Sequence, residues 1–383
     1  MAARSLRIGI DARVLAEPAP MGVARYLAGL LRALAEQASQ HDYILYLCRN
    51  ALPELPFEKR PFMQRVLGHN PLTASPLVWQ QCVLPWAVRK DKIDVLFSPY
   101  YCGPLLTSVP QIVCLHDISF VLFPKDFPSW IHFKPKLLAY PSSRRATKVI
   151  TVSEFSRQEI LRVYGLRQEK VQVVSPGSER PSCRPERLQA GMRRNRIPAP
   201  FFLFAGSLLP RRQVKCVLQA LSKVSSECHF VVVGERDAQR QRALQEFAQT
   251  WNVADRVHIL GHISDEHLED LYLRTLALIS PSTYEGFGLP VLEAMIRGVP
   301  VVAWDIPIMR EVVGEAGLLI KSGDIGALAG AMRAIATSQR QRALLKQKGY
   351  AQAKKFSWES AAAHFIEILD ETTARGRNLA HNV

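Results

Sequence analysis

The sequence predicts an α/β fold of two domains, each built around a parallel sheet. A chain of 383 residues is too long for one ordinary core and suits two domains of about 150 to 200 residues. Short apolar runs alternate with helical patterns in both halves, as they do in parallel α/β proteins. A hydrophobic content of 48% with 22% charged residues is typical of a globular protein.

The first half opens this alternation at residue 6. Helices are expected over about residues 22–37 and 129–146. The first of these places its apolar side chains on one stripe, as a helix packed on a sheet does: Val23, Tyr26, Leu27, Leu30, Leu31 and Leu34. Strands are expected at the apolar runs 6–10, 43–48, 94–98, 111–117 and 149–153.

Residues 176–200 interrupt the alternation. They hold five prolines and six Arg against two Glu, a composition that indicates a linker. We therefore expect an N-terminal domain over residues 1–177, a linker over 178–200, and a C-terminal domain over 201–356. A helix within residues 357–383 is expected to pack back on the N-terminal domain.

The second half resumes the alternation. Helices are expected at about 212–224 and 238–250, and two further helical segments, at 338–355 and 357–374, close the chain. Strands are expected at the apolar runs 201–206, 230–234, 256–261, 277–282, 299–304 and 317–320.

The net charge and the spacing of the cysteines limit the kinds of partner and site that the protein can have. A net charge of +15 favours an anionic partner: nucleic acid, a phospholipid surface or a phosphorylated substrate. The seven cysteines are scattered and never spaced as CxxC, so neither a disulfide framework nor a zinc site is expected. No apolar run approaches the roughly 20 residues that span a bilayer, and the start lacks a secretion signal, so we expect a cytoplasmic protein.

The most informative stretch runs from Ser280 to Met295. It reads as the end of a strand, a glycine-rich turn after Glu285, and a helix with Pro290 near its first position. A helix start favours phosphate or another anion, and glycines allow a ligand to approach closely. Glu293, early in this helix, points back toward its start, so two carboxylates are expected beside one anion site.

This stretch, EGFGLPVLEAM followed by GVPVVA, resembles the Glu-x7-Glu signature of family 4 glycosyltransferases. The resemblance continues, in family order, through GVARYLAGLL, His116-Asp117, VSEFSRQEI, FLFAGSLLPRR, RVHILGHIS and REVVGEAGLLI, and covers most of residues 6–336. It implies the GT-B fold, in which two Rossmann-like domains face a central cleft. The C-terminal domain would bind a nucleotide-sugar donor, and the N-terminal domain would present the acceptor.

The resemblance also implies a role for individual residues. Glu293 would bind the ribose hydroxyls, and Glu285 the transferred sugar. Arg211 and Arg212 would offset the charge of the donor diphosphate. The other donor contacts would come from Gly22, Ile263, Gly286, Phe287, Gly288 and Leu289, and His116 would contact a sugar hydroxyl.

Enzymes similar to this one retain the anomeric configuration, by front-side attack that needs no enzyme nucleophile. Independently of the resemblance, the sequence has no Asp-x-Asp pair to hold a divalent ion, so we expect a metal-free site and no cofactor besides the donor. The motifs look most like those of mannosyltransferases that use GDP-mannose in polysaccharide, lipopolysaccharide or glycolipid assembly. A UDP-sugar is the main alternative donor, and the acceptor, a glycan or a lipid-linked glycan, stays open.

Other interpretations stay open at this stage. Leu209-Pro-Arg-Arg-Gln213 departs from the family's usual Glu-Pro-Arg-Lys-Asn, which leaves room for a relative that binds sugar nucleotides without turning them over. By position alone, His116 fits a histidine bonded to a neighbouring backbone group, and the two arginines fit solvated charges. A nucleic-acid-binding protein is disfavoured because no RNA-stacking signature or zinc knuckle is present.

Residues 120–148 combine aromatic side chains with six Lys or Arg against one Asp. This mixture suits an anionic membrane surface. We therefore hypothesise that this face meets a lipid-linked acceptor, with peripheral contact at the inner face of the cytoplasmic membrane. A solvated amphipathic helix explains the mixture equally well.

Overall fold

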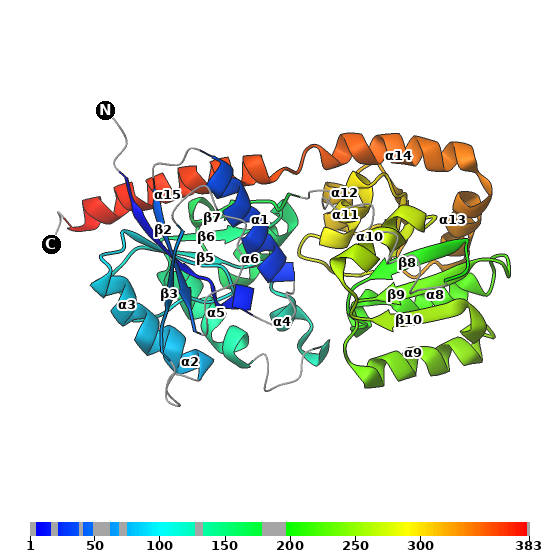
Figure 1. Cartoon of the computed structure of the whole chain (residues 1–383), viewed down its shortest axis with the longest axis horizontal. Helices are drawn as coiled ribbons and strands as arrows, with labels where there is room; N and C mark the ends of the chain where they lie inside the picture. The colour runs from blue at the N-terminus through cyan, green and yellow to red at the C-terminus, as the bar shows by residue number, and fades with distance from the viewer. Residues whose placement is uncertain are drawn as a thin grey trace. The chain divides into compact units, whose positions relative to one another are not determined.

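The computed structural model describes residues 5–16, 22–37, 41–48, 62–68, 75–126, 133–177 and 197–380. The chain divides into two compact units (Figure 1). Unit 1 consists of residues 1–177 together with 356–383, and unit 2 of residues 178–355. Most of the expected linker, residues 178–196, lies outside the described residues. No helix in the described part of the chain is both long and apolar enough to span a bilayer.

Unit 1 is built on a seven-stranded sheet in which every pairing is parallel. The spatial order is β3-β2-β1-β4-β5-β6-β7, with β4 at the centre and the first strand, β1, between β2 and β4. The strands are β1 (Arg7–Asp11), β2 (Asp42–Leu47), β3 (Phe62–Val66), β4 (Val95–Ser98), β5 (Gln111–Cys114), β6 (Lys148–Thr151) and β7 (Val171–Val173). The inner strands are buried on both faces, which is why they read as continuous apolar runs.

Helices cover both faces of this sheet. They are η1 (Arg13–Ala16), α1 (Gly22–Glu36), α2 (Pro76–Val78), η2 (Trp79–Val83), α3 (Leu84–Lys90), α4 (Ser119–Leu122), η3 (Pro124–Asp126), α5 (Phe133–Arg145), α6 (Glu154–Tyr164), η4 (Gln168–Lys170) and α15 (Trp358–Ala380). The connection from β1 to β2 runs in one direction along the sheet, and the connections from β3 to β4 and from β5 to β6 run in the other. Right-handed crossovers therefore place α1 on one face and α3 and α5 on the opposite face.

The last helix, α15, packs against α1 in unit 1. Its first residue, Trp358, fits against two glycines: a Cβ atom at Gly29 would lie 2.2 Å from the indole, and one at Gly177 would lie 2.2 Å from the Trp358 amide. Farther along, Phe365 packs on Phe97 of β4, with ring centroids 4.8 Å apart. The C-terminal helix thus completes the core of unit 1.

Unit 2 is built on a six-stranded parallel sheet of order β10-β9-β8-β11-β12-β13. Its strands are β8 (Phe201–Ala205), β9 (His229–Val233), β10 (Val257–Gly261), β11 (Leu278–Ser280), β12 (Val301–Trp304) and β13 (Leu318–Ile320). Its helices are η5 (Pro210–Arg212), α8 (Val214–Leu221), α9 (Ala238–Thr250), η6 (Ala254–Arg256), α10 (Asp265–Arg274), α11 (Leu289–Ile296), α12 (Pro307–Val312), α13 (Ile325–Thr337) and α14 (Gln339–Ala353). Because β8 and β11 are neighbours, the loops that follow these two strands lie at the same edge of the sheet.

Candidate active site

Two loops of unit 2 meet at the carboxyl ends of β8 and β11. One carries Arg211 and Arg212, and the other carries Thr283 and Glu285. The carbonyl oxygen of Arg211 accepts a hydrogen bond from the Thr283 amide at 2.8 Å and another from the Thr283 hydroxyl at 3.1 Å. Because ligands of open α/β sheets bind outside the carboxyl ends of the strands, this edge is the expected place for a site.

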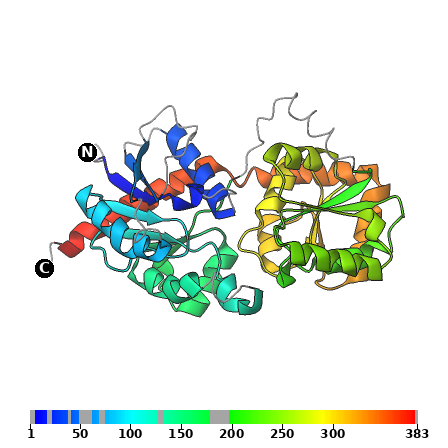
Figure 2. The same ribbon diagram turned by 60° about the horizontal axis from the view of Figure 1, so that its bottom comes forward.

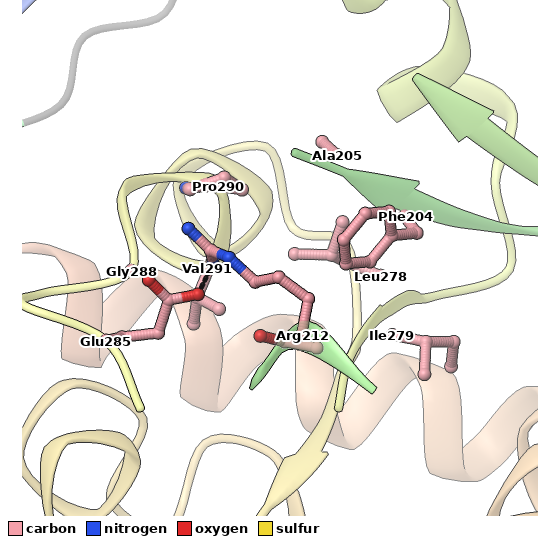
Figure 3. Close-up of a pocket in the computed structure, with 10 residues that line it drawn as sticks. Phe204, Ala205, Arg212, Leu278, Ile279, Glu285, Gly288, Pro290 and Val291 are labelled. Carbon is pink, nitrogen blue, oxygen red and sulfur yellow. Dashed lines mark ion pairs between the residues drawn. The ribbon is translucent and has the colours of Figure 1, made fainter. Parts of the chain in front are cut away.

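At this edge the Arg212 guanidinium forms an ion pair with the carboxylate of Glu285 (Figure 3). Glu285 is buried, with 7% of its surface exposed, and Arg212 also lies 3.4 Å from the Ser282 hydroxyl. The pair faces a small hollow. The residues that line it are Phe204, Ala205, Arg212, Leu278, Ile279, Ser280, Glu285, Gly288, Pro290 and Val291.

The turn after Glu285 leads directly into α11. Gly288 is the N-cap of that helix and has the left-handed backbone conformation, with φ of 93°, which glycine adopts at little cost. A Cβ atom at Gly288 would lie 3.0 Å from Met309, so the position favours glycine sterically as well. Pro290 then occupies the first turn, where its missing N–H costs nothing. The positive end of α11 is thereby placed beside the Arg212–Glu285 pair.

Glu293 is held by α10. The hydroxyl of Tyr272 donates a hydrogen bond to Oε2 of Glu293 at 3.1 Å. Arg297 donates to the Glu293 backbone carbonyl, stacks over the Tyr272 ring and forms a buried ion pair with Glu269 at 2.6 Å. Glu293 therefore has a fixed direction, although it does not line the hollow.

Two groups that sequence reasoning missed support the basic loop. The buried carboxylate of Glu235 accepts hydrogen bonds from the amides of Leu208, Arg236 and Asp237 at 2.5, 2.9 and 2.8 Å. In the sequence, the position of Glu235 directly after the apolar run FVVVG could have indicated a carboxylate at the carboxyl end of a strand.

The second supporting group is Gln213, which has a left-handed backbone conformation with φ of 47°. Its side-chain oxygen accepts a hydrogen bond from the Trp304 indole at 2.9 Å. A glutamine thus fills the position at which the resemblance leads one to expect asparagine, and the contact with Trp304 holds the end of the arginine loop.

His116 lies in unit 1, after β5. Its Nε2 is 2.9 Å from the Pro99 carbonyl, an acceptor, so the proton is assigned to Nε2 and Nδ1 is left as an acceptor. The ring packs edge-on against Tyr26 of α1, whose hydroxyl donates to the Val174 carbonyl at 3.1 Å. Burial lowers the pKa of His116, and the bond to Pro99 together with the charge of Asp117 offsets only part of this.

The structure brings only some of the predicted residues together. Arg212, Glu285 and Gly288 line the hollow, and the carbonyl oxygen of Arg211 is hydrogen-bonded to Thr283 on the loop that carries Glu285. Buried Gly286 and Phe287 form the turn, and Leu289 begins α11. Half-buried Ile263 lies between β10 and α10 and is not part of the hollow.

Gly22 and His116 belong to unit 1. Gly22 is the exposed first residue of α1. Within the described residues, no group of three or more His, Cys, Asp or Glu is arranged to hold a metal ion.

Comparison with known proteins agrees with this architecture. The family model for glycosyltransferase family 4 matches residues 20–179, and that for glycosyl transferases group 1 matches residues 193–352. Each model falls on one half of the chain, and between them they cover most of its length.

Two curated relatives match the chain over most of its length. The O-antigen chain mannosyltransferase B of Escherichia coli is 26% identical over 362 residues, which are 90% of this chain and 94% of that protein. The O-antigen chain mannosyltransferase RfbU of Salmonella typhimurium is 26% identical over 313 residues, 79% of this chain and 84% of that protein.

Among solved structures, Anabaena HepE in complex with UDP and glucose matches with a TM-score of 0.75. The match covers 96% of this chain and 100% of HepE at 18% identity, so it supports the fold alone. The two parallel-sheet units, the matches to both family models and the similarity to these relatives all indicate the same family. The chain belongs to the family 4 glycosyltransferases and is a glycosyltransferase with the GT-B fold.

Proposed function

We propose that the enzyme is a retaining, metal-independent hexosyltransferase that transfers mannose from GDP-mannose to a glycan or lipid-linked acceptor. The product would enter polysaccharide, lipopolysaccharide or glycolipid assembly. The similarity to two O-antigen mannosyltransferases supports mannose as the transferred sugar, because both of them match this chain over most of their length. A UDP-sugar is the alternative donor, because the structure of HepE was solved with UDP.

The observation that carries the proposal is the ion pair of Arg212 with Glu285 beside the start of α11. A donor diphosphate carries negative charge, which guanidinium groups and a helix N-terminus both stabilise. When the diphosphate approaches Arg212, it competes with Glu285 for the guanidinium. The carboxylate is then free to accept hydrogen bonds from sugar hydroxyls.

The same groups explain how transfer could proceed without a metal ion. Negative charge grows on the diphosphate as the bond to the sugar breaks, and Arg211 and Arg212 provide fixed positive charge for it. A donor phosphate oxygen would assist removal of the acceptor proton on the same face of the sugar, so that configuration is retained. The neutral His116, with Nδ1 as an acceptor, would take a hydrogen bond from a sugar hydroxyl.

Nucleotide binding tests the donor assignment first. Thermal shifts with GDP, UDP, TDP and ADP should be largest for GDP, because a ligand that binds only the folded form raises Tm. Glu293→Ala should abolish nucleotide binding measured by calorimetry, whereas Glu285→Ala should mainly lower the rate of transfer or donor hydrolysis. Native nucleotide affinity in Glu293→Ala would contradict the assignment of the ribose site.

Two further measurements test the chemistry. Activity should survive a chelator such as EDTA, and the anomeric proton of the product should show by NMR the configuration of the donor. Loss of activity that added Mg²⁺ or Mn²⁺ restores would refute metal independence, and inversion at the anomeric carbon would refute the proposed mechanism.

We further propose peripheral contact with an anionic membrane, since a lipid-linked acceptor is reached at a bilayer surface. The exposed Arg144 and Arg145 at the end of α5 support this contact. The ends of the segment 120–148 do not contribute: Phe120 is buried against Tyr101, and Lys148 is buried in an ion pair with Glu371. Residues 127–132 of that segment lie outside the described residues.

A further inference from the structure

Three segments of unit 1 contain no Asp or Glu. They are residues 75–90, which form α2, η2 and α3; residues 99–110, which join β4 to β5; and residues 133–147, which include α5. Together they carry six Lys or Arg. Of these, Arg89, Lys90, Arg144 and Arg145 are exposed. Although the protein has 34 acidic residues, none lies in these segments; residues 75–90 and 133–147 carry only positive charge, and residues 99–110 carry no charge.

Hydrogen bonds join the three segments into one surface. The β4–β5 loop is held on one side by Gln81 of η2, whose Nε2 lies 3.3 Å from the Gly103 carbonyl. On the other side Ser142 of α5 donates to the same carbonyl at 3.1 Å, and Arg145 donates to the Thr107 carbonyl at 3.0 Å. The helices α3 and α5 also share the sheet face opposite α1, and Figure 2 turns this side of the molecule toward the viewer. We refer to this surface as the acid-free face.

Each of the three segments also exposes large apolar side chains. Trp86 of α3 is 61% exposed, Leu106 of the loop 80%, and Leu137 of α5 58%. Leu77, Val78 and Tyr140 on the same face are exposed as well. Burial of apolar side chains is favourable, so several large ones left exposed on neighbouring segments are typical of a surface that binds a partner.

The geometry at Trp86 indicates which kind of partner fits. The ammonium group of Lys90 lies 4.9 Å from the centre of the Trp86 ring, one helical turn away. An aromatic ring next to a flexible cation is typical of the boundary between lipid headgroups and acyl chains, where the ring enters the boundary and the cation meets the phosphates. A nucleic acid would use the cations but would leave Leu106 and Leu137 in water.

We propose that the acid-free face is the surface by which the enzyme docks on an anionic lipid bilayer, with Trp86 and Leu106 inserted among the headgroups. This deepens the proposed function, because it assigns the membrane contact to particular side chains. It does not depend on the donor site in unit 2, whose nucleotide binding is measured separately.

Co-sedimentation of the full chain with vesicles tests the electrostatic part. Binding should be strong to phosphatidylcholine mixed with phosphatidylglycerol and weak to phosphatidylcholine alone. The double variant Arg89→Glu/Lys90→Glu should lose roughly tenfold or more in affinity for the anionic vesicles. The matched control, Arg340→Glu/Lys348→Glu, makes the same charge change on exposed positions of α14 in unit 2 and should bind almost as the wild type does.

Quenching of tryptophan fluorescence by brominated lipid tests the insertion. Vesicles of brominated phosphatidylglycerol should quench the wild type, and Trp86→Phe should remove most of that quenching. Trp251→Phe, which replaces a 36% exposed tryptophan of unit 2, should keep it. Thermal shifts with GDP and UDP should be the same in all these variants, which shows that they fold and separates a failure of docking from a failure of the donor assignment.

Several results would overturn the proposal. Equal binding to neutral and anionic vesicles would show that docking does not depend on the charge of the lipid. Equal losses of affinity in the two charge variants would show that the acid-free face is not the docking surface. Loss of RNA or DNA binding in Arg89→Glu/Lys90→Glu, with no vesicle binding by the wild type, would identify a nucleic acid as the partner. Dissociation of a dimer by Trp86→Ser would identify a second copy of the chain.

Discussion

Thr283 binds the carbonyl oxygen of Arg211 twice, through its amide at 2.8 Å and through its hydroxyl at 3.1 Å. This contact joins the loop that carries the arginine pair to the loop that carries Glu285. The direction of the two guanidinium groups therefore depends on a residue that need not touch the donor.

Replacement of Thr283 by valine should weaken donor binding while leaving the fold intact. Valine keeps the shape and the amide bond but loses the hydroxyl bond, which is worth about 1 kcal/mol. We expect the KM for the donor to rise several-fold in steady-state assays. Thr250→Val removes a similar hydroxyl bond at the exposed end of α9 and serves as the control. An unchanged KM in Thr283→Val would show that the arginine loop is held by other contacts.

Arg212→Ala should destabilise unit 2 as well as impair catalysis. It leaves the buried carboxylate of Glu285 without its ion-pair partner, which typically costs about 3–5 kcal/mol. The double variant Arg212→Ala/Glu285→Ala should recover much of that stability in urea unfolding, yet it should stay inactive. If the double variant is no more stable than the single one, the ion pair does not explain the loss.

Tyr272→Phe should weaken nucleotide binding without abolishing it. The tyrosine hydroxyl donates to Glu293, so its loss frees the carboxylate to rotate. We expect Kd for the nucleotide to rise about threefold to tenfold, the effect of one ordinary hydrogen bond, because the lost bond acts on the nucleotide only through Glu293. Calorimetry on Tyr272→Phe and Glu293→Ala together checks this. Wild-type affinity in Tyr272→Phe would mean that the remaining contacts of Glu293 suffice.

Stability should fall as the pH drops below about 6.5. Burial lowers the pKa of His116, His41 and His258, so at mildly acid pH the unfolded chain binds more protons than the folded one. The contribution of these neutral histidines to the free energy of unfolding is complete above the pKa of the unfolded state, 6.5. It is lost as the pH falls toward their lower pKa values in the folded state. Urea unfolding between pH 8 and pH 5 should show this slope, and His116→Gln should reduce it. A slope that is identical in His116→Gln would exclude this histidine as a source.

Gly29→Ala should destabilise unit 1 because the added Cβ would lie 2.2 Å from the Trp358 ring. The loss should exceed 1 kcal/mol, as overpacking of a tight core usually does. Gly330→Ala is the matched control, since it lies inside α13 and its Cβ would meet no heavy atom closer than 4.0 Å. That variant should gain up to about 1 kcal/mol from helix propensity. Equal effects in thermal unfolding would show that the Trp358 contact is looser than it appears.

The sequence predicted the inner strands well because parallel strands that are buried on both faces read as continuous apolar runs. The edge strands β3 and β7 were missed. β3 is half-exposed and includes Gln64 and Arg65, and β7 is only three residues long. The helical stretch 76–90 was missed as well, because Pro76 and Pro85 interrupt its pattern and a π-helical turn shifts its period.

The candidate site was only partly predictable for a different reason. Residues in signature motifs, such as Glu285 and Arg212, can be found from local pattern. Glu235, Trp304 and Tyr272 act through contacts with residues 21 to 91 positions away. No local periodicity reports such contacts, so only the folded chain reveals them.

The return of α15 to unit 1 affects the order in which the protein can fold during synthesis. All of unit 2 emerges from the ribosome before Trp358 and Phe365 do. Until then unit 1 lacks the side chains that pack on Gly29 of α1 and on Phe97 of β4. The half that is translated first is thus the half that matures last, and a nascent chain would expose apolar surface for almost the whole of translation.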